Sequence, residues 1–189
     1  YRNCSNSFAG SQAYLVADAE KKQACLDRYR TLGKGLKVGI SWCSGNTLEG
    51  RRRTISLEQW EPVLTVPGIQ FINLQYGDCG EAIKQAKDQL GVVIYQDETI
   101  DPLSDMDGFA AQVAAMDLVI SIDNSTVHVA GALGIPTWVM LPSKAEWRWF
   151  VNRDDCPWYP GVRLFRQSIP GVWQEVLSHV KETLVNDYV

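Results

Sequence analysis

The strongest constraint on the fold is a regular alternation of short apolar stretches with helical segments of ten or more residues, beginning at Leu36. Strands joined by segments of this length pair in parallel through right-handed crossovers. We therefore predict an α/β fold, a Rossmann-like doubly wound parallel sheet of about six strands. The expected strands cover 36–42, 69–75, 92–96, 117–122, 136–141 and 162–166, and the expected helices cover 56–66, 79–91, 105–116, 126–133 and 171–186.

Composition narrows the class of protein. The chain has 189 residues, with 18 lysines and arginines against 22 acidic residues, which argues against a general nucleic-acid-binding surface. It contains no apolar run long enough to span a membrane and no leader-like start, so we expect a soluble, cytoplasmic protein that is not transmembrane. Five widely spaced cysteines and two histidines make a structural zinc site or a disulfide framework improbable.

The chain divides into two parts by pattern. Residues 1–35 are expected to form a linker and a docking helix, and residues 36–189 the Rossmann-like domain. Asp18 is in place to cap the docking helix, which would end at Gly33 or Gly35. On that helix Ala24, Leu26 and Tyr29 are expected to lean inward.

Ligands of such sheets lie beyond the carboxyl ends of the strands, where the strand order switches, so the loops that follow Trp42, Gln75 and Ile122 carry the candidate sites. The first loop, "CSGNTLEGRRRTIS", offers the small residues Ser44, Gly45, Asn46 and Thr47 and three positive charges, Arg51, Arg52 and Arg53. Together they could hold a diphosphate, or they could form a solvated basic loop tip. The glycines match neither G-x-G-x-x-G nor the P-loop.

The second loop, "YGDCGEA", places Gly77 at a strand end and Glu81 in the first turn of the next helix. A carboxylate there could accept hydrogen bonds from ribose or sugar hydroxyls. Alternatively, Glu81 only interacts favourably with the helix dipole.

The third loop, "IDNSTVH", joins a buried strand to a helix that ends at Gly134. Free backbone N–H groups at the helix start, with the hydroxyls of Ser125 and Thr126, predict an anion cradle. Asp123 would end the strand and orient amides or a ligand hydroxyl, and His128 could donate to a phosphate or remain a satisfied core histidine. A Ser-His-Asp hydrolase is disfavoured, because G-x-S-x-G is absent.

Aromatic residues gather near the carboxyl-terminal third. In the cluster of Trp147, Trp149, Trp158 and Tyr159, an exposed ring such as Trp147 could stack on a nucleobase or sugar, with Arg148 or Arg153 nearby for a phosphate. Trp149 and Trp158 are instead expected to anchor a long loop against the core. The last helix carries an apolar stripe for core or interdomain packing, formed by Val172, Val176, Leu177, Val180 and Leu184.

At several of these segments the chain resembles a known family. "VGISWCSGN", "RRRTISLEQWEPVL", "INLQYG", "SIDNSTVHVAGALGIPTWVMLP" and "EWRWF" followed by "CPWYPGVRLFRQ" are similar to the carboxyl-terminal half of family 9, heptosyltransferase-like glycosyltransferases. The likeness covers about residues 36–184 and is greatest to bacterial versions fused behind tetratricopeptide repeats. It implies one half of a GT-B enzyme, in which two Rossmann-like domains face each other and the second binds the sugar nucleotide.

The resemblance also implies roles for residues. Asp123, Ser125, Thr126 and His128 would approach the diphosphate and the donor sugar, 51–53 would neutralise the leaving diphosphate, and Glu81 would meet the ribose. Such enzymes generally use no metal, and no cofactor is expected beyond the nucleotide diphosphate-sugar that serves as donor. Asn124 departs from the family, which usually has Thr there, so a hydroxyl contact at this position moves to Ser125.

A second departure concerns catalysis. Inverting sugar transfer needs a general base near the acceptor hydroxyl, and the chain offers no convincing candidate, so the catalytic residue is expected outside it. The expected partners are a nucleotide sugar and a missing amino-terminal acceptor domain or tetratricopeptide-repeat region. Two other functions remain open: a sugar-nucleotide epimerase or hydrolase of GT-B architecture, and a non-catalytic nucleotide-binding or protein-interaction domain.

Overall fold

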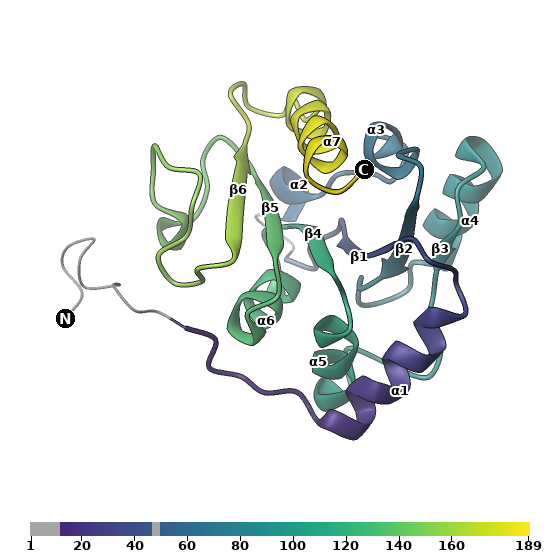
Figure 1. Cartoon of the computed structure of the whole chain (residues 1–189). Coiled ribbons are helices and arrows are strands. Elements are labelled where there is room, and N and C mark those ends of the chain that lie inside the picture. Colours follow the sequence, from purple (N-terminus) through teal and green to yellow (C-terminus); the bar gives the residue numbers. More distant parts are fainter. Residues whose placement is uncertain (1–11, 47–49) are drawn as a thin grey trace.

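A six-stranded sheet, parallel throughout, forms the centre of the molecule in the computed structural model, which describes residues 12–46 and 50–189 (Figure 1). The strand order is β3-β2-β1-β4-β5-β6, so the order reverses between β1 and β4. This confirms the predicted doubly wound sheet. The strands are β1 (Leu36–Ser41), β2 (Ile69–Asn73), β3 (Ile94–Tyr95), β4 (Leu118–Ile122), β5 (Thr137–Leu141) and β6 (Val162–Arg166).

Helices cover both faces of the sheet. In Figure 1, α3 and α7 lie above the sheet, and α1, α5 and α6 lie below it. The shared buried cluster places α4 on the same face as α3 and α7. The helices are α1 (Ala19–Arg30), α2 (Gly50–Arg53), α3 (Glu61–Leu64), α4 (Gly80–Leu90), α5 (Met106–Ala114), α6 (Ser125–Leu133) and α7 (Gln174–Tyr188), with a short 3-10 turn at Trp147–Trp149.

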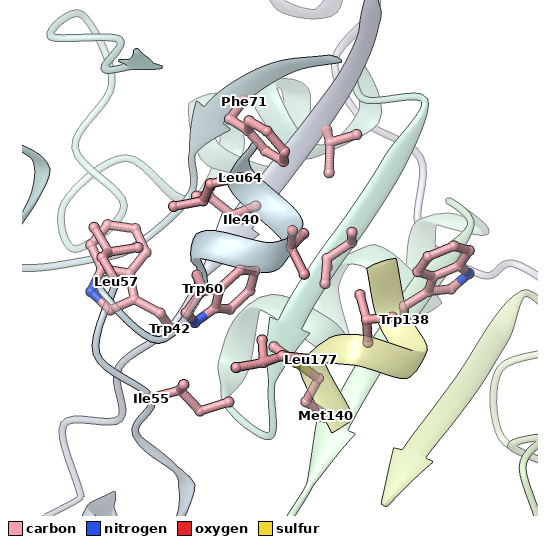
Figure 2. Packing of buried hydrophobic residues seen from close by; sticks show 14 of the residues in the cluster. Ile40, Trp42, Ile55, Leu57, Trp60, Leu64, Phe71, Trp138, Met140 and Leu177 are labelled. Carbon is pink, nitrogen blue, oxygen red and sulfur yellow. The ribbon is translucent and has the colours of Figure 1, made fainter. Parts of the chain in front are cut away.

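The core follows from the alternation along the strands. Ile40, Trp138 and Met140 point to the α3 and α7 face, where Trp60 and Leu177 meet them (Figure 2). The intervening strand residues turn to the opposite face, which α1, α5 and α6 cover. Both faces of a parallel sheet are thereby shielded from water, as such sheets require.

The predicted helix over 56–66 is largely wrong. Only α3 is helical, after a series of turns, in which the backbone N–H of Gln59 donates to the Ser56 carbonyl at 3.0 Å. Pro62 explains the difference: it has no N–H, and its ring clashes with the preceding turn when it lies inside a helix. It is tolerated here because it lies in the first turn of α3.

The helix expected before the sheet exists as α1 and is part of the core. Asp18 caps it by accepting a hydrogen bond from the backbone N–H of Lys21 at 2.8 Å. Cys25 and Tyr29 are each only 1% exposed, whereas Ala24 points outward, contrary to the prediction. Residues 1–11, the first part of the expected linker, lie outside the described residues.

A buried carboxylate fastens α1 to the sheet. Asp97 follows β3 and is 5% exposed, and it accepts hydrogen bonds from Arg28 and Tyr29 of α1, each at 2.9 Å. Thr99 donates its backbone N–H and its hydroxyl to the other carboxylate oxygen. Burial raises the pKa of Asp97, but these hydrogen bonds outweigh it and the pKa is lowered overall.

The final helix keeps most of its predicted stripe. Val176, Leu177, Val180 and Leu184 are buried, but Val172 lies before α7 and is 36% exposed. None of the described helices combines the length and the apolarity needed to cross a membrane.

Candidate functional site

The candidate site lies where β1 and β4 end side by side, at the reversal in strand order. Asn124 connects the two strand ends. Its amide nitrogen donates to the Ser41 hydroxyl at 2.7 Å and to the Cys43 carbonyl at 3.3 Å. Its amide oxygen accepts from the backbone N–H of Thr126 at 3.0 Å, which makes Asn124 the N-cap of α6, and from the Ser121 hydroxyl at 3.2 Å.

This arrangement defines what Asn124 can do. Asn124 is 7% exposed, and both donors and both acceptor sites of its side-chain amide are used within the protein. Asn124 therefore builds the start of α6 and leaves ligand contacts to its neighbours. The exposed Ser125 presents its hydroxyl at the first turn, where N–H groups lack helical acceptors, and Thr126 is buried beneath it.

Asp123 and Arg53 meet beside the helix start. Arg53 Nη1 lies 3.2 Å from Asp123 Oδ2 and donates to the Asp123 carbonyl at 3.3 Å. Asp123 is 1% exposed, and burial raises the pKa of its carboxyl although the Arg53 charge lowers it. This carboxylate orients Arg53 and is itself closed off from solvent.

Glu146, which the sequence did not single out, links two cations at this site. One carboxylate oxygen accepts from Arg53 Nη2 at 2.5 Å, and the other lies 3.0 Å from Arg148 Nη2. The hydrogen bond from Arg53 lowers the pKa of Glu146. An alternation of charges thus runs Asp123, Arg53, Glu146, Arg148 across the strand ends.

His128 occupies the end of this network. Arg148 Nη1 donates to His128 Nε2 at 3.2 Å, so a neutral ring carries its proton on Nδ1, which lies 3.1 Å from the Tyr159 hydroxyl. The ring stacks on Trp149, with centroids 5.4 Å apart. Burial and the Arg148 charge lower the pKa of His128 to about 4, so the ring is neutral at pH 7. Both ring nitrogens have partners within the protein.

The three consecutive arginines do not converge. Arg53 reaches Asp123, whereas Arg51 and Arg52 line a separate cavity, together with Lys144 and Gln167. Ser44, Gly45 and Asn46 line an adjoining hollow of about 630 Å³ that Arg51 also borders. Thr47 falls in the segment 47–49, outside the described residues.

The residues after β2 are also separated. Gly77 lines a cavity of about 450 Å³ at the ends of β2 and β3, together with the acidic side chains Asp97, Glu98 and Asp101. Glu81 lies elsewhere: it is exposed on α4 and accepts a hydrogen bond from Gln85 at 3.0 Å. Its place on the helix surface fits the helix-dipole interpretation.

The aromatic residues form a surface cavity beside α6. Trp147 is 73% exposed and borders a volume of about 350 Å³ with His128, Arg148, Trp158 and Tyr159. Trp149 is fully buried, and the Trp158 indole donates to the Arg148 carbonyl at 3.0 Å, which agrees with their expected role in anchoring the loop. Gly131 of α6 lies directly under Tyr159: a Cβ there would come within 2.5 Å of its ring.

Sequence reasoning missed Glu146 and Gln167, whereas Arg148 and Tyr159 were expected beside the aromatic cluster. The segment "EWRWF" drew attention as an aromatic cluster, but its alternation of Glu146 and Arg148 with tryptophans was itself a signal of paired charges beside an aromatic surface. In the part of the chain that the structure covers, no group of three or more His, Cys, Asp or Glu side chains is placed to hold a metal ion.

Comparison with known proteins gives one relative by sequence and several by structure. Protein FlbA of Caulobacter vibrioides is 41% identical over 184 residues, which is 97% of this chain and 30% of that protein. The chain thus spans less than a third of the length of this curated relative. No family model matches the chain.

The structural neighbours share the fold at low identity. A family 9 glycosyl transferase from Veillonella parvula matches with a TM-score of 0.61 and 13% identity, over 93% of this chain and 48% of that one. ADP-heptose LPS heptosyltransferase II of E. coli matches with a TM-score of 0.59 and 14% identity, over 92% of this chain and 54% of that one. The C-terminal domain of a group 1 glycosyl transferase, LpcC of Francisella tularensis, matches with a TM-score of 0.52 and 13% identity, over 93% of this chain and 86% of that one. The fold of this chain is that of a GT-B glycosyltransferase-like domain.

Proposed function

We propose that the chain is the donor-binding domain of a metal-independent, inverting glycosyltransferase that resembles ADP-heptose-type heptosyltransferases. The observation that carries this proposal is the start of α6 at the strand-order reversal, where Asn124 holds the first turn and Arg53 lies beside it. Helix N-termini and guanidinium groups both favour phosphate oxygens.

The diphosphate would lie over the first turn of α6. Ser125 supplies a hydroxyl and a free N–H there, and Arg53 and Arg148 supply positive charge. Because Asp123 and Glu146 together balance the charges of Arg53 and Arg148, the phosphates must compete with these carboxylates. His128, neutral and held by Arg148 and Tyr159, contributes shape and packing more than charge.

The nucleoside would extend over the ends of β2 and β3. The cavity there is bordered by Gly77 and by carboxylates that can accept hydrogen bonds from ribose hydroxyls, Glu98 and Asp101 being the more exposed. Asp97 is already committed to α1. The general base and the acceptor site would lie on a part of the enzyme beyond these 189 residues.

Calorimetric titration of the chain with ADP, UDP and GDP and their sugar conjugates tests this function. We expect saturable binding of one nucleotide, weakened about tenfold or more by Arg53→Lys, which keeps the charge but cannot bridge Asp123 and Glu146 as the guanidinium does. Arg163→Lys is the matched control, because Arg163 lies on β6 and pairs with Asp187. Absence of binding to every nucleotide at millimolar concentration, with circular dichroism unchanged, would overturn the proposal.

A further inference from the structure

A second cavity lies apart from the start of α6, since no residue of α6 lines it. It has a volume of about 510 Å³ and opens between α2, the carboxyl ends of β5 and β6, and the start of α7. Among the residues that line it are Arg51, Arg52, Lys144, Gln167, Pro170 and Trp173. Its lining includes three basic residues and no acidic one.

Two of the cations that line this cavity, Arg51 and Lys144, are not paired with a carboxylate among the described residues. Arg51 comes from α2 and Lys144 from the loop after β5, and both side chains are exposed. Among the described residues, neither forms an ion pair, in contrast to Arg53 and Arg148, which share Glu146. Two unpaired cations from separate segments that face one hollow make a favourable potential for an anion.

Gln167, which lines the cavity, joins two of the loops that border it. It is 5% exposed, and its amide oxygen accepts from the backbone N–H of Ser143 at 3.4 Å and of Gly171 at 3.2 Å, which ties the loops after β5 and β6 together. Its amide nitrogen has no hydrogen-bond partner among the described residues. A buried donor left without a partner costs about 1–3 kcal/mol and marks a place where a further acceptor is needed.

The remaining wall combines apolar and uncharged polar side chains. Trp173, which is 5% exposed, Pro142 and Pro170 supply its apolar part. A volume of about 510 Å³ lies within the range of small-molecule sites, and a few polar groups on an apolar wall are typical of them. A bare inorganic ion would leave most of this space empty, so the cavity fits an organic molecule that carries one anionic group.

We propose that this cavity binds a small organic acid, with its phosphate or carboxylate group between Arg51 and Lys144 and its carbon skeleton against Trp173. The site is separate from the start of α6 and from the acidic cavity at the ends of β2 and β3. It therefore stands whether or not the chain binds a nucleotide sugar. Within a glycosyl transfer reaction, it would select for an acidic sugar or a phosphorylated acceptor.

Titration of the whole chain with glucose 6-phosphate, glucuronate and glucose tests the site, with the indole N–H signals of the tryptophans followed by NMR. We expect one or both anions to shift the Trp173 signal saturably and glucose to leave it unchanged. The anion that binds more tightly identifies the source of the charge, a phosphate ester or a sugar carboxylate. Assignment of the signal comes from Trp173→Phe.

Charge reversal at the cavity gives the second arm of the test. Lys144→Glu should weaken anion binding about tenfold or more, whereas Lys181→Glu, an exposed change on α7 away from the cavity, should leave it unaltered. The site is refuted by equal shifts with glucose, by the absence of saturation with both anions, or by unchanged affinity in Lys144→Glu. ADP titration of the same variants distinguishes failure of the anion site from failure of the donor site. Lys144 does not border the donor site, so Lys144→Glu should leave ADP binding unchanged.

Discussion

At the scale of single residues, Asn124 shows how one side chain joins two halves of a sheet. Asn124→Ala removes the cap of α6 and the hydrogen bonds to Ser41 and Cys43, so we expect the free energy of unfolding to fall by about 2–3 kcal/mol. Ser125→Ala, at an exposed neighbouring position, should change it by less than about 0.5 kcal/mol. Urea denaturation followed by circular dichroism measures both. Equal effects would contradict the role given to Asn124.

His128 makes a prediction about pH. Its pKa in the folded protein, about 4, lies below its ordinary value, so the unfolded chain binds the proton first as the pH falls. The stabilising contribution of neutral His128 is therefore complete above about pH 6.5 and is lost progressively down to about pH 4. The difference in unfolding free energy between the wild type and His128→Gln should shrink over this window. NMR titration of the imidazole checks the pKa directly, and an ordinary value near 6.5 would contradict it.

At the scale of elements, α6 depends on a close approach to the loop after β5. Gly131→Ala would bring a Cβ within 2.5 Å of the Tyr159 ring, so we expect a loss of about 1–3 kcal/mol and displacement of Tyr159 from His128. Gly80→Ala is the matched control: it also lies in a helix, but a Cβ there meets nothing nearer than 3.8 Å, and Ala favours helix. Thermal unfolding should separate the two variants clearly. Similar melting temperatures would mean that the loop yields easily.

A buried carboxylate adds to the apolar contacts that attach α1 to the sheet. Asp97→Ala leaves the Arg28 guanidinium and the Tyr29 hydroxyl without their acceptor, so we expect about 2–3 kcal/mol lower stability. The loss should concentrate in α1, seen as faster amide hydrogen exchange over residues 19–30. Asp101→Ala, at an exposed carboxylate in the same loop, serves as the control. Unchanged protection of α1 would show that its apolar contacts alone hold it.

The elements differ in how far the sequence predicted them. β4, α6 and β5 matched closely, because a buried strand, an Asn cap, a left-handed glycine at Gly134 and a second apolar strand all indicate the same boundaries. The stretch before β2 did not match its predicted helix. Its apolar spacing suggests a long helix, but Pro62 restricts the residue at which a helix can begin. β3 has two residues where five were predicted, because it lies at the edge of the sheet and pairs with β2 alone.

At the scale of the whole molecule, the carboxyl edge of the sheet carries opposite charge at its two ends. Acidic side chains border the cavity over β2 and β3, and basic ones border the cavity over β5 and β6. The sequence predicted that functional residues would gather at this edge. It could not show that Arg53 turns away from Arg51 and Arg52, since directions within one helical turn depend on partners such as Asp123 and Glu146 from distant loops.

The position of β1 between β2 and β4 has a consequence for the order in which the chain folds during synthesis. β1 emerges early and pairs with β2 soon after, but its other edge is covered only when β4 appears, after β3 and α5. Until then, the backbone groups of Val38 to Ser41 remain open to pairing with another chain. Pairing of β4 with β1 covers this central edge, and β5 and β6 then extend the sheet outward from β4.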